Sequence, residues 1–350
     1  MVPIKTNSNY PLSRVSAAAR IHSSVHIEPF TTIEDDVEIG EGTFIGSNVT
    51  IHGGVRIGKG CYISPGTVIS PEKKRLEFWS QEQMRANGIH SEVLISDHVH
   101  LEPNVTMLGG IVIGEGTWIG SNVTVYDGAR VGKKCKIFPG AVISGIPQDL
   151  KFHGEKTTLE IGDNTTIREC VTLNRGTDYH GKTVIGKNVL IMAYVHIAHD
   201  CIIGNNVIIS NSVNLAGHVE IGDSVVIGGV SAFRQFVKVG IHAFISGGSL
   251  VRKDVPPYVK AGREPLQYEG VNSIGLRRRG FSSDTIHHIQ DIYRHLFLSG
   301  MNNTTALDYI EAHLKASEER DEVITFVRNA SRGIIKGHYS HSSQKEEATE

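Results

Sequence analysis

Large aliphatic side chains recur every six residues along most of the chain. Nine isoleucines follow this period without a break over residues 21–69, a second run covers residues 95–143, and a third covers residues 185–251. An α-helix repeats its apolar face every 3.6 residues and a strand every two, so neither element alone accounts for a period of six.

A smaller side chain sits four residues after each large one. Thr43, Ala243 and three of the four cysteines (Cys61, Cys135 and Cys201) occupy this second position, which makes those cysteines core residues. Two inward positions in every six fit one side of a triangular prism, with 18 residues to a coil and coils about 4.8 Å apart. The pattern therefore predicts a mainly β fold, a left-handed parallel β-helix of hexapeptide repeats.

The period also predicts how the chain is divided. Residues 21–70 return as residues 95–144, with 28 of 50 positions identical, and helical spacing begins only after residue 283. We expect an N-terminal segment (1–20), extra β-helix coils (21–70), a helical linker that resets the register (71–94), the β-helix that carries the chemistry (95–254), a C-terminal α-helical domain (255–337) and a disordered tail (338–350). Asp149, Glu155 and Tyr179 break the period, so loops should leave the prism there.

Composition narrows the range of functions. A formal net charge of −2 offers no basic surface for nucleic acid, and no apolar stretch approaches the roughly 18 residues of a membrane span. The first nine residues are polar and contain no apolar segment of a secretion signal. The four cysteines are widely separated, so we expect a protein of the reducing cytoplasm.

Coil arithmetic brings three residues into one outward column. His199 lies two residues beyond an inward isoleucine, and Gly217 and Gln235 follow at intervals of 18. A histidine beside an unobstructed backbone N–H suits acyl transfer, because one group accepts a proton and the other stabilises an oxyanion. Outward histidines are more commonly just solvated, and His196, His199 and His218 could instead bind zinc between chains.

Two further segments suggest binding. The segment that abandons the core period contains Asp149 and Lys151, and such excursions often carry function, although a simple solvated turn is the alternative. Arg277, Arg278 and Arg279 precede the helical region and could bind phosphate, or form an ordinary solvated basic face.

Between residues 92 and 335 the chain carries motifs that are more specific than the period. They are IPQDLKF (146–152), IGDNTTIRE (161–169), NRGT (174–177), HIAHD (196–200), LAGHV (215–219), RQF (234–236), DVPPYV (254–259) and GLRRRGF (275–281). In this combination the chain resembles the UDP-N-acetylglucosamine acyltransferase family, which begins lipid A biosynthesis.

The resemblance implies a homotrimer with active sites between neighbouring prisms. It implies transfer of an (R)-3-hydroxyacyl group from acyl carrier protein to the 3-position of UDP-N-acetylglucosamine or, as an amide, to its 3-amino analogue, with no cofactor and no metal. His199 would be the general base, Asp200 would orient it, and Gly217 would supply the oxyanion-hole N–H. The residues implied to bind the UDP-sugar are Asp149, Lys151, His196, His218, Gln235, Asn272, Arg278 and Arg279.

Gly247 falls where the family places the residue that limits acyl length, and its lack of a side chain favours a longer chain. Arg234 stands where the family commonly has histidine, and Ile274 stands where some members have glutamate. Family members usually begin near residue 92, so the first 90 residues are interpreted as coils that lengthen the trimer or recruit a partner. The alternatives are a γ-type zinc carbonic anhydrase, a non-catalytic scaffold, and the N-acyltransferase of the same pathway, whose N-terminal domain is globular.

Overall fold

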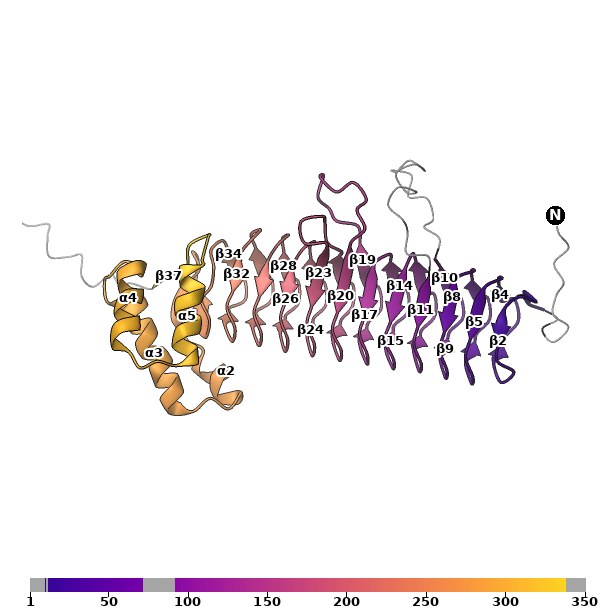
Figure 1. Ribbon diagram of the computed structural model, residues 1–350, viewed down its shortest axis with the longest axis horizontal. Helices are drawn as coiled ribbons and strands as arrows, with labels where there is room; N and C mark the ends of the chain where they lie inside the picture. The colour runs from indigo at the N-terminus through magenta and orange to yellow at the C-terminus, as the bar shows by residue number, and fades with distance from the viewer. Residues whose placement is uncertain (1–9, 11, 72–91, 338–350) are drawn as a thin grey trace, which may run out of the picture.

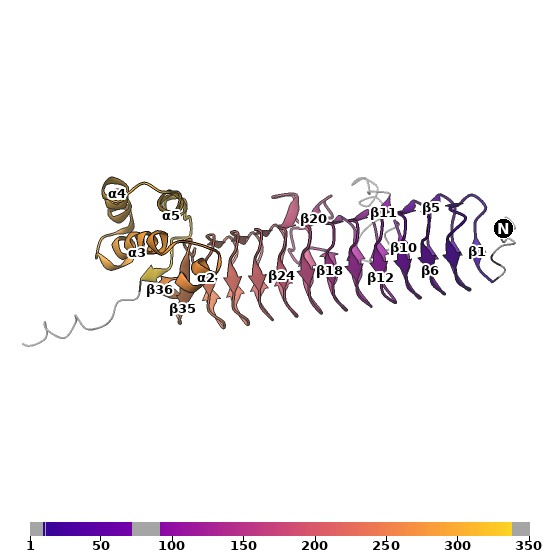
Figure 2. The ribbon, with the colours of Figure 1, turned by 90° about the horizontal axis from the view of Figure 1, so that it is seen from below.

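The computed structural model describes residues 10, 12–71 and 92–337. Short strands wind into a long three-sided prism, and the helices gather at its C-terminal end (Figures 1 and 2). Successive strands pass in turn to sheets A, B and C, and each strand pairs in parallel with the strand one coil away. The predicted fold class, a parallel β-helix of hexapeptide coils followed by helices, is confirmed.

Each side of the prism is one sheet of short strands. Sheet A contains β1 (Arg14–Val15), β4 (Thr32–Ile33), β7 (Thr50–Ile51), β10 (Val68–Ser70), β13 (Thr106–Leu108), β16 (Thr124–Tyr126), β19 (Val142–Gly145), β22 (Thr172–Asn174), β25 (His196–Ile197), β28 (Asn214–Leu215), β31 (Ala232–Phe233) and β34 (Leu250–Val251). Sheet B contains β2 (Arg20–Ile21), β5 (Val37–Ile39), β8 (Val55–Ile57), β11 (Val93–Ile95), β14 (Ile111–Ile113), β17 (Ala129–Val131), β20 (Thr158–Ile161), β23 (Lys182–Ile185), β26 (Ile202–Ile203), β29 (Glu220–Ile221) and β32 (Lys238–Val239). Sheet C contains β3 (His26–Ile27), β6 (Phe44–Ile45), β9 (Tyr62–Ile63), β12 (His100–Leu101), β15 (Trp118–Ile119), β18 (Lys136–Ile137), β21 (Thr166–Ile167), β24 (Leu190–Ile191), β27 (Ile208–Ile209), β30 (Val226–Ile227), β33 (Phe244–Ile245), β35 (Val259–Gly262), the antiparallel β36 (Gln267–Val271) and β37 (Lys336–Gly337).

The prism is filled by the two inward positions of each side. Ile51 and Ile143 are fully buried, and Cys61, Cys135 and Cys201 lie among them as expected. Asn48 and Asn122 turn corners with φ of 55° and 58°, a left-handed conformation that asparagine tolerates better than most residues. The six-residue period is therefore the packing period of one side of the prism.

Two boundaries differ from those expected. The prism starts before residue 21, because Val15 lies one period earlier and is fully buried in β1. The linker does not reset the coil: Val68 pairs with Thr106, a separation of 38 residues that equals one coil of 18 plus an insertion of 20. The expected linker helix and the tail from residue 338 lie outside the described residues. The sequence offset of 74 is thus three coils plus this insertion.

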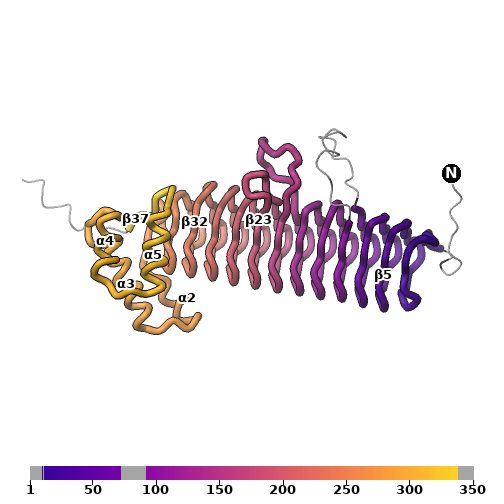
Figure 3. Tube along the Cα trace, viewed as in Figure 1, coloured from indigo at the N-terminus to yellow at the C-terminus, as the bar shows by residue number. Residues whose placement is uncertain are grey.

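Two loops leave the prism between sheet A and sheet B (Figure 3). We call residues 146–157 the Asp149 loop and residues 175–181 the Thr177 loop. Val142 pairs with Thr172, which is 12 residues more than one coil, and Thr158 pairs with Lys182, which is six residues more. Both additions are multiples of six, so the core period continues unchanged beyond them.

The C-terminal region contains α2 (Ser273–Arg278), α3 (Ser283–Leu298), α4 (Asn303–His313) and α5 (Glu318–Arg328), together with β35, β36 and β37. Ser282 caps α3 by accepting a hydrogen bond from Thr285 N–H. The predicted stripe of α3 is buried, and the Tyr293 hydroxyl donates to Pro257 O (2.5 Å), which ties the helix to the prism end. Among the described residues, no helix combines the length and apolarity needed to cross a bilayer.

Replacing Ile143 by alanine should lower the free energy of unfolding by about 2–5 kcal/mol, because the cavity would lie in a core with little freedom to collapse. Val142, the outward neighbour on β19, provides a matched control, and Val142→Ala should cost well under half as much. Urea unfolding of both variants measures the difference. Equal losses would contradict the assignment of inward and outward positions.

Candidate active site

His199, Gly217 and Gln235 lie one above another on the edge between sheets A and B, which we call the A–B edge. They follow β25, β28 and β31, which pair in sequence. His218 N–H donates to His199 O (3.1 Å) and Phe236 N–H donates to Gly217 O (3.3 Å), so the coils are in register at this edge. The predicted column is confirmed as geometry.

The His199 imidazole lies directly against the Gly217 backbone. A Cβ added at Gly217 would lie 2.6 Å from His199 Cε1 and 2.7 Å from Nε2, so only glycine leaves room for the ring. Gly217 N–H donates to no acceptor in the described part of the chain. The imidazole is outside the hydrophobic interior, as expected, but it is only 4% exposed because the two loops cover it.

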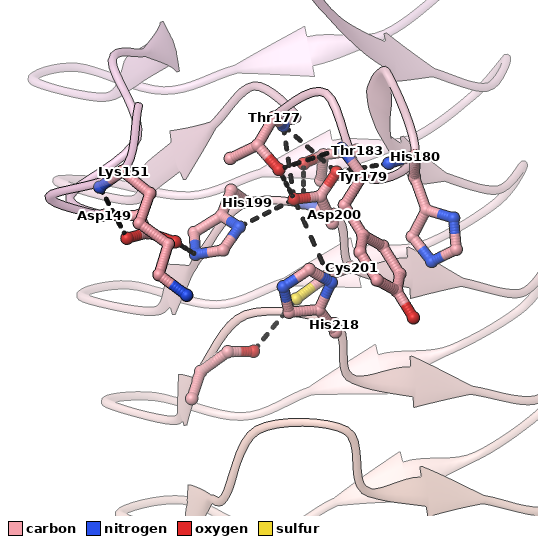
Figure 4. A network of polar contacts seen from close by, with 11 residues as sticks. Asp149, Lys151, Thr177, Tyr179, His180, Thr183, His199, Asp200, Cys201 and His218 are labelled. Carbon is pink, nitrogen blue, oxygen red and sulfur yellow. Dashed lines mark hydrogen bonds and ion pairs between the residues drawn. The ribbon is translucent and has the colours of Figure 1, made fainter. Parts of the chain in front are cut away.

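The two ring nitrogens of His199 face different carboxylates (Figure 4). Nδ1 lies 2.7 Å from Asp200 Oδ2, whereas Nε2 lies 3.8 Å from Asp149 Oδ2. An ionised Asp200 accepts a hydrogen bond, so it keeps the proton of the neutral ring on Nδ1. Nε2 is then the nitrogen that can accept a proton, and it points toward the Asp149 loop.

The Thr177 loop holds Asp200 in place. Thr177 donates to the carboxylate through its N–H (3.0 Å) and its hydroxyl (2.6 Å), and His180 N–H donates as well (3.2 Å). Burial raises the pKa of Asp200, but the hydrogen bonds from His199, Thr177 and His180 outweigh it and hold that pKa at about 2. Sequence reasoning missed Thr177 and His180; Thr177 belongs to the NRGT motif, which was the one available signal.

The low pKa of Asp200 predicts an acid-labile contribution to stability. The folded-state pKa of about 2 lies below the ordinary value of 3.8, so the contribution is complete above pH 4 and disappears as the pH falls toward 2. Wild-type protein should lose about 2 kcal/mol more unfolding free energy than Asp200→Asn between pH 5 and pH 2. Unfolding curves at stepped pH test this, and parallel losses in the two proteins would contradict it.

His218 and His196 lie near this pair in different surroundings. The His218 ring stacks on Phe236 at 4.3 Å, and burial lowers the pKa of His218 below its usual value. His196 faces outward on sheet A, where its Nδ1 lies 2.7 Å from the Thr172 hydroxyl, and burial lowers its pKa too. Both rings therefore favour the neutral form at pH 7.

A zinc-type cluster at this edge would differ from the one expected. Ligating atoms of His199, Asp200 and His218 lie within 4.8 Å of one another, whereas His196 is not part of that group. Both Asp200 oxygens already accept hydrogen bonds from His199 or the Thr177 loop. The carboxylate is thus arranged to orient an imidazole.

A buried arginine anchors the Asp149 loop. Arg175 is 3% exposed, donates to Asp127 O (3.0 Å) and lies over the Phe152 ring at 5.5 Å. Lys151 N–H donates to Asp149 Oδ1 (3.0 Å), which fixes the turn that presents Asp149 to His199. The Lys151 side chain is exposed and free to meet a ligand at this edge.

The remaining predicted site residues lie on the other two edges. Asn272 begins α2 and donates to His242 O (2.9 Å), on the edge between sheets B and C. Arg278 and Arg279 end the same helix, where Ile274 is 65% exposed. Gly247 lies between β33 and β34, on the edge between sheets C and A. A single chain therefore does not bring these residues to His199.

Comparison with known sequences places relatives over both parts of the chain. A family profile described as UDP-N-acetylglucosamine O-acyltransferase, domain 2, matches residues 254–335, and bacterial transferase hexapeptide repeats match residues 18–53, 38–71, 110–145 and 182–217. The acyl-(acyl-carrier-protein)–UDP-N-acetylglucosamine O-acyltransferase of Chlorobaculum parvum is 61% identical over 207 residues, 59% of this chain and 78% of the relative. That of Thermodesulfovibrio yellowstonii is 40% identical over 257 residues, 71% of this chain and 100% of the relative.

Solved structures agree with these relatives. The UDP-N-acetylglucosamine acyltransferase LpxA from Bacteroides fragilis is 38% identical with a TM-score of 0.63, covering 92% of this chain and 100% of its own. The enzyme from Francisella novicida is 30% identical with a TM-score of 0.65, covering 94% and 98%. These comparisons do not favour a carbonic anhydrase.

Proposed function

Because the chain belongs to the acyl-(acyl-carrier-protein)–UDP-N-acetylglucosamine O-acyltransferase family, we propose that it catalyses that transfer. The donor is an (R)-3-hydroxyacyl group on acyl carrier protein, and the acceptor is the 3-position of UDP-N-acetylglucosamine, at the start of lipid A biosynthesis. The contact of His199 with both Asp200 and Gly217 is the observation that carries the proposal.

In the proposed reaction, His199 Nε2 removes the proton of the sugar 3-hydroxyl as its oxygen bonds to the thioester carbon. The negative charge that develops on the carbonyl oxygen is stabilised by Gly217 N–H, which has no acceptor among the described residues. The carbon–sulfur bond then breaks, and His199 returns its proton to the leaving thiolate. Asp200, ionised at neutral pH, stabilises the imidazolium between the two transfers.

We propose that the working form is a homotrimer. Asp149, Lys151, Gln235 and His218 share the A–B edge with His199, whereas Asn272, Arg278 and Arg279 lie toward the edge between sheets B and C. A second copy whose sheet C faces the A–B edge of the first would bring both groups to one cleft. Arginines from the neighbour could then bind the diphosphate bidentately.

The edge between sheets C and A suits an acyl chain. Tyr194 and Val230 are 64% and 72% exposed there, with φ of 62° and 59°. A β-branched residue rarely adopts positive φ, and such strained conformations concentrate at functional sites. Gly247 lies on the same edge near the backbone of Gly229, so bare backbone continues the apolar surface.

Gly247→Met should shift the preferred donor toward shorter acyl chains. A Cβ at Gly247 would lie 3.2 Å from Gly229 O, so a side chain fits after a small shift and then occupies the space beyond. We expect kcat/KM for the longest accepted donor to fall at least about tenfold, with Gly247→Ala giving a smaller shift. Assays with donors of graded length test this; an unchanged order of preference would refute the role of Gly247.

The direct test supplies purified protein with hydroxyacyl carrier proteins of several lengths and either UDP-N-acetylglucosamine or its 3-amino analogue. We expect acylated sugar nucleotide by mass spectrometry, and the ratio of ester to amide product identifies the preferred acceptor. No product from either acceptor would defeat the proposal. A cytoplasmic location belongs to the same proposal and is supported by the four unpaired cysteines.

A further inference from the structure

Aromatic rings form a continuous stack on the outside of sheet C in the N-terminal coils. His26, Phe44, Tyr62 and His100 occupy the same outward position of β3, β6, β9 and β12. Their ring centroids are 5.2, 4.8 and 4.8 Å apart, with interplanar angles of 12°, 8° and 14°. We call these four residues the ring ladder.

The other two faces of the same coils have a different character. Outward positions on sheet B carry ion pairs, with Arg20 and Arg56 both bound to Glu38. Sheet A presents threonines at this level, such as Thr32 and Thr50. The ring ladder therefore marks one face of these coils as suited to an apolar contact.

The geometry of the ladder restricts what it can bind. Each inner ring has both faces covered by its neighbours, so the ladder presents ring edges to its surroundings. A sugar or a nucleobase needs an open ring face for stacking, and the inner rings offer none. A strip of edges, partly exposed at Tyr62 (41%), instead suits a flat protein surface.

The outward row of the ladder continues along the whole prism. Trp118 follows His100 on β15, then come Lys136 and Thr166. In the coils around the candidate site the row becomes aliphatic and aromatic again, with Leu190, Ile208, Val226 and Phe244. A partner covering such a row must itself be long and straight, and a second copy of this chain has that shape.

We infer that the ring ladder packs against a neighbouring copy of the chain and extends the subunit interface of the proposed trimer beyond the catalytic coils. The inference rests on the proposed assembly, in which sheet C of one copy faces the A–B edge of the next. The additional coils then contribute association between subunits, while the chemistry stays at His199.

The experiment compares Phe44→Lys/Tyr62→Lys with Leu94→Lys by sedimentation equilibrium. Leu94 is a matched control because it is an exposed apolar residue (39%) on sheet B of the neighbouring coil. We expect the ladder variant to raise the subunit dissociation constant at least tenfold, with kcat of the assembled enzyme unchanged and with the control like wild type. An unchanged dissociation constant in the ladder variant would overturn the inference.

A second measurement does not depend on the folding of that variant. A photoreactive phenylalanine analogue at Phe44 should give crosslinks between subunits on irradiation, and crosslinks only within one chain would overturn the inference. Failure of the proposed function is separate, since an inactive trimer with ladder crosslinks keeps the interface. An active protein that sediments as a monomer keeps the function and overturns the interface.

Discussion

Replacing His199 by alanine will lower kcat by roughly 10²–10⁴-fold, the usual contribution of a general base. His199 Nε2 is the nitrogen left free once Asp200 binds Nδ1, and no other described histidine combines a carboxylate at Nδ1 with a glycine backbone against its ring. Steady-state kinetics with acyl carrier protein substrate measure the loss. KM for the sugar nucleotide should change far less than kcat.

His153→Ala is the matched control for this prediction. His153 is an exposed histidine of the Asp149 loop whose backbone N–H binds Glu155, so its loss removes an imidazole near the site without touching the Asp200 network. We expect activity close to wild type. Near-normal kcat in folded His199→Ala protein would remove the catalytic proposal and favour a non-catalytic scaffold.

Gly217→Ala will reduce kcat by a comparable amount, about 10²-fold or more, although alanine keeps the backbone N–H. The new methyl would lie within 2.7 Å of two ring atoms of His199, so the imidazole must leave its place beside the N–H. Displacement of a catalytic group by about 1 Å is enough for a loss of this size. Unfolding curves should confirm that the variant remains folded.

A double-mutant cycle separates displacement from other causes. If Gly217→Ala acts by moving the imidazole, the same change in a His199→Ala background will have little further effect on the residual rate. Equal losses in both backgrounds would show that the methyl acts elsewhere, for instance on the thioester itself.

The His199–Gly217 pair was predictable because the length of a coil does not change. Eighteen residues close every turn of this edge beyond β25, so spacing along the chain becomes distance between neighbours. The roles of Thr177 and His180 were not predictable, since they lie in an inserted loop that obeys no period. Their hydrogen bonds to Asp200 depend on how that loop folds back.

The distribution of the other site residues follows a similar logic. Asn272 and Gly247 were grouped with His199 through family resemblance, and the fold places them on different edges. Periodicity within one chain cannot state which edge of a neighbour lies opposite. The same limit applies to the linker, where an insertion of 20 residues looked like a change of register but leaves the stacking continuous.

The stacking of each coil on its neighbours alone has a consequence for how this molecule wears. Solenoids of this kind lose structure from their ends inward, because a terminal unit is held from one side. Eight strands of sheet A precede β25, and four of them come before residue 72. Fraying at the N-terminus therefore consumes sacrificial turns first, and hydrogen exchange should slow progressively from β1 toward the coil that holds His199.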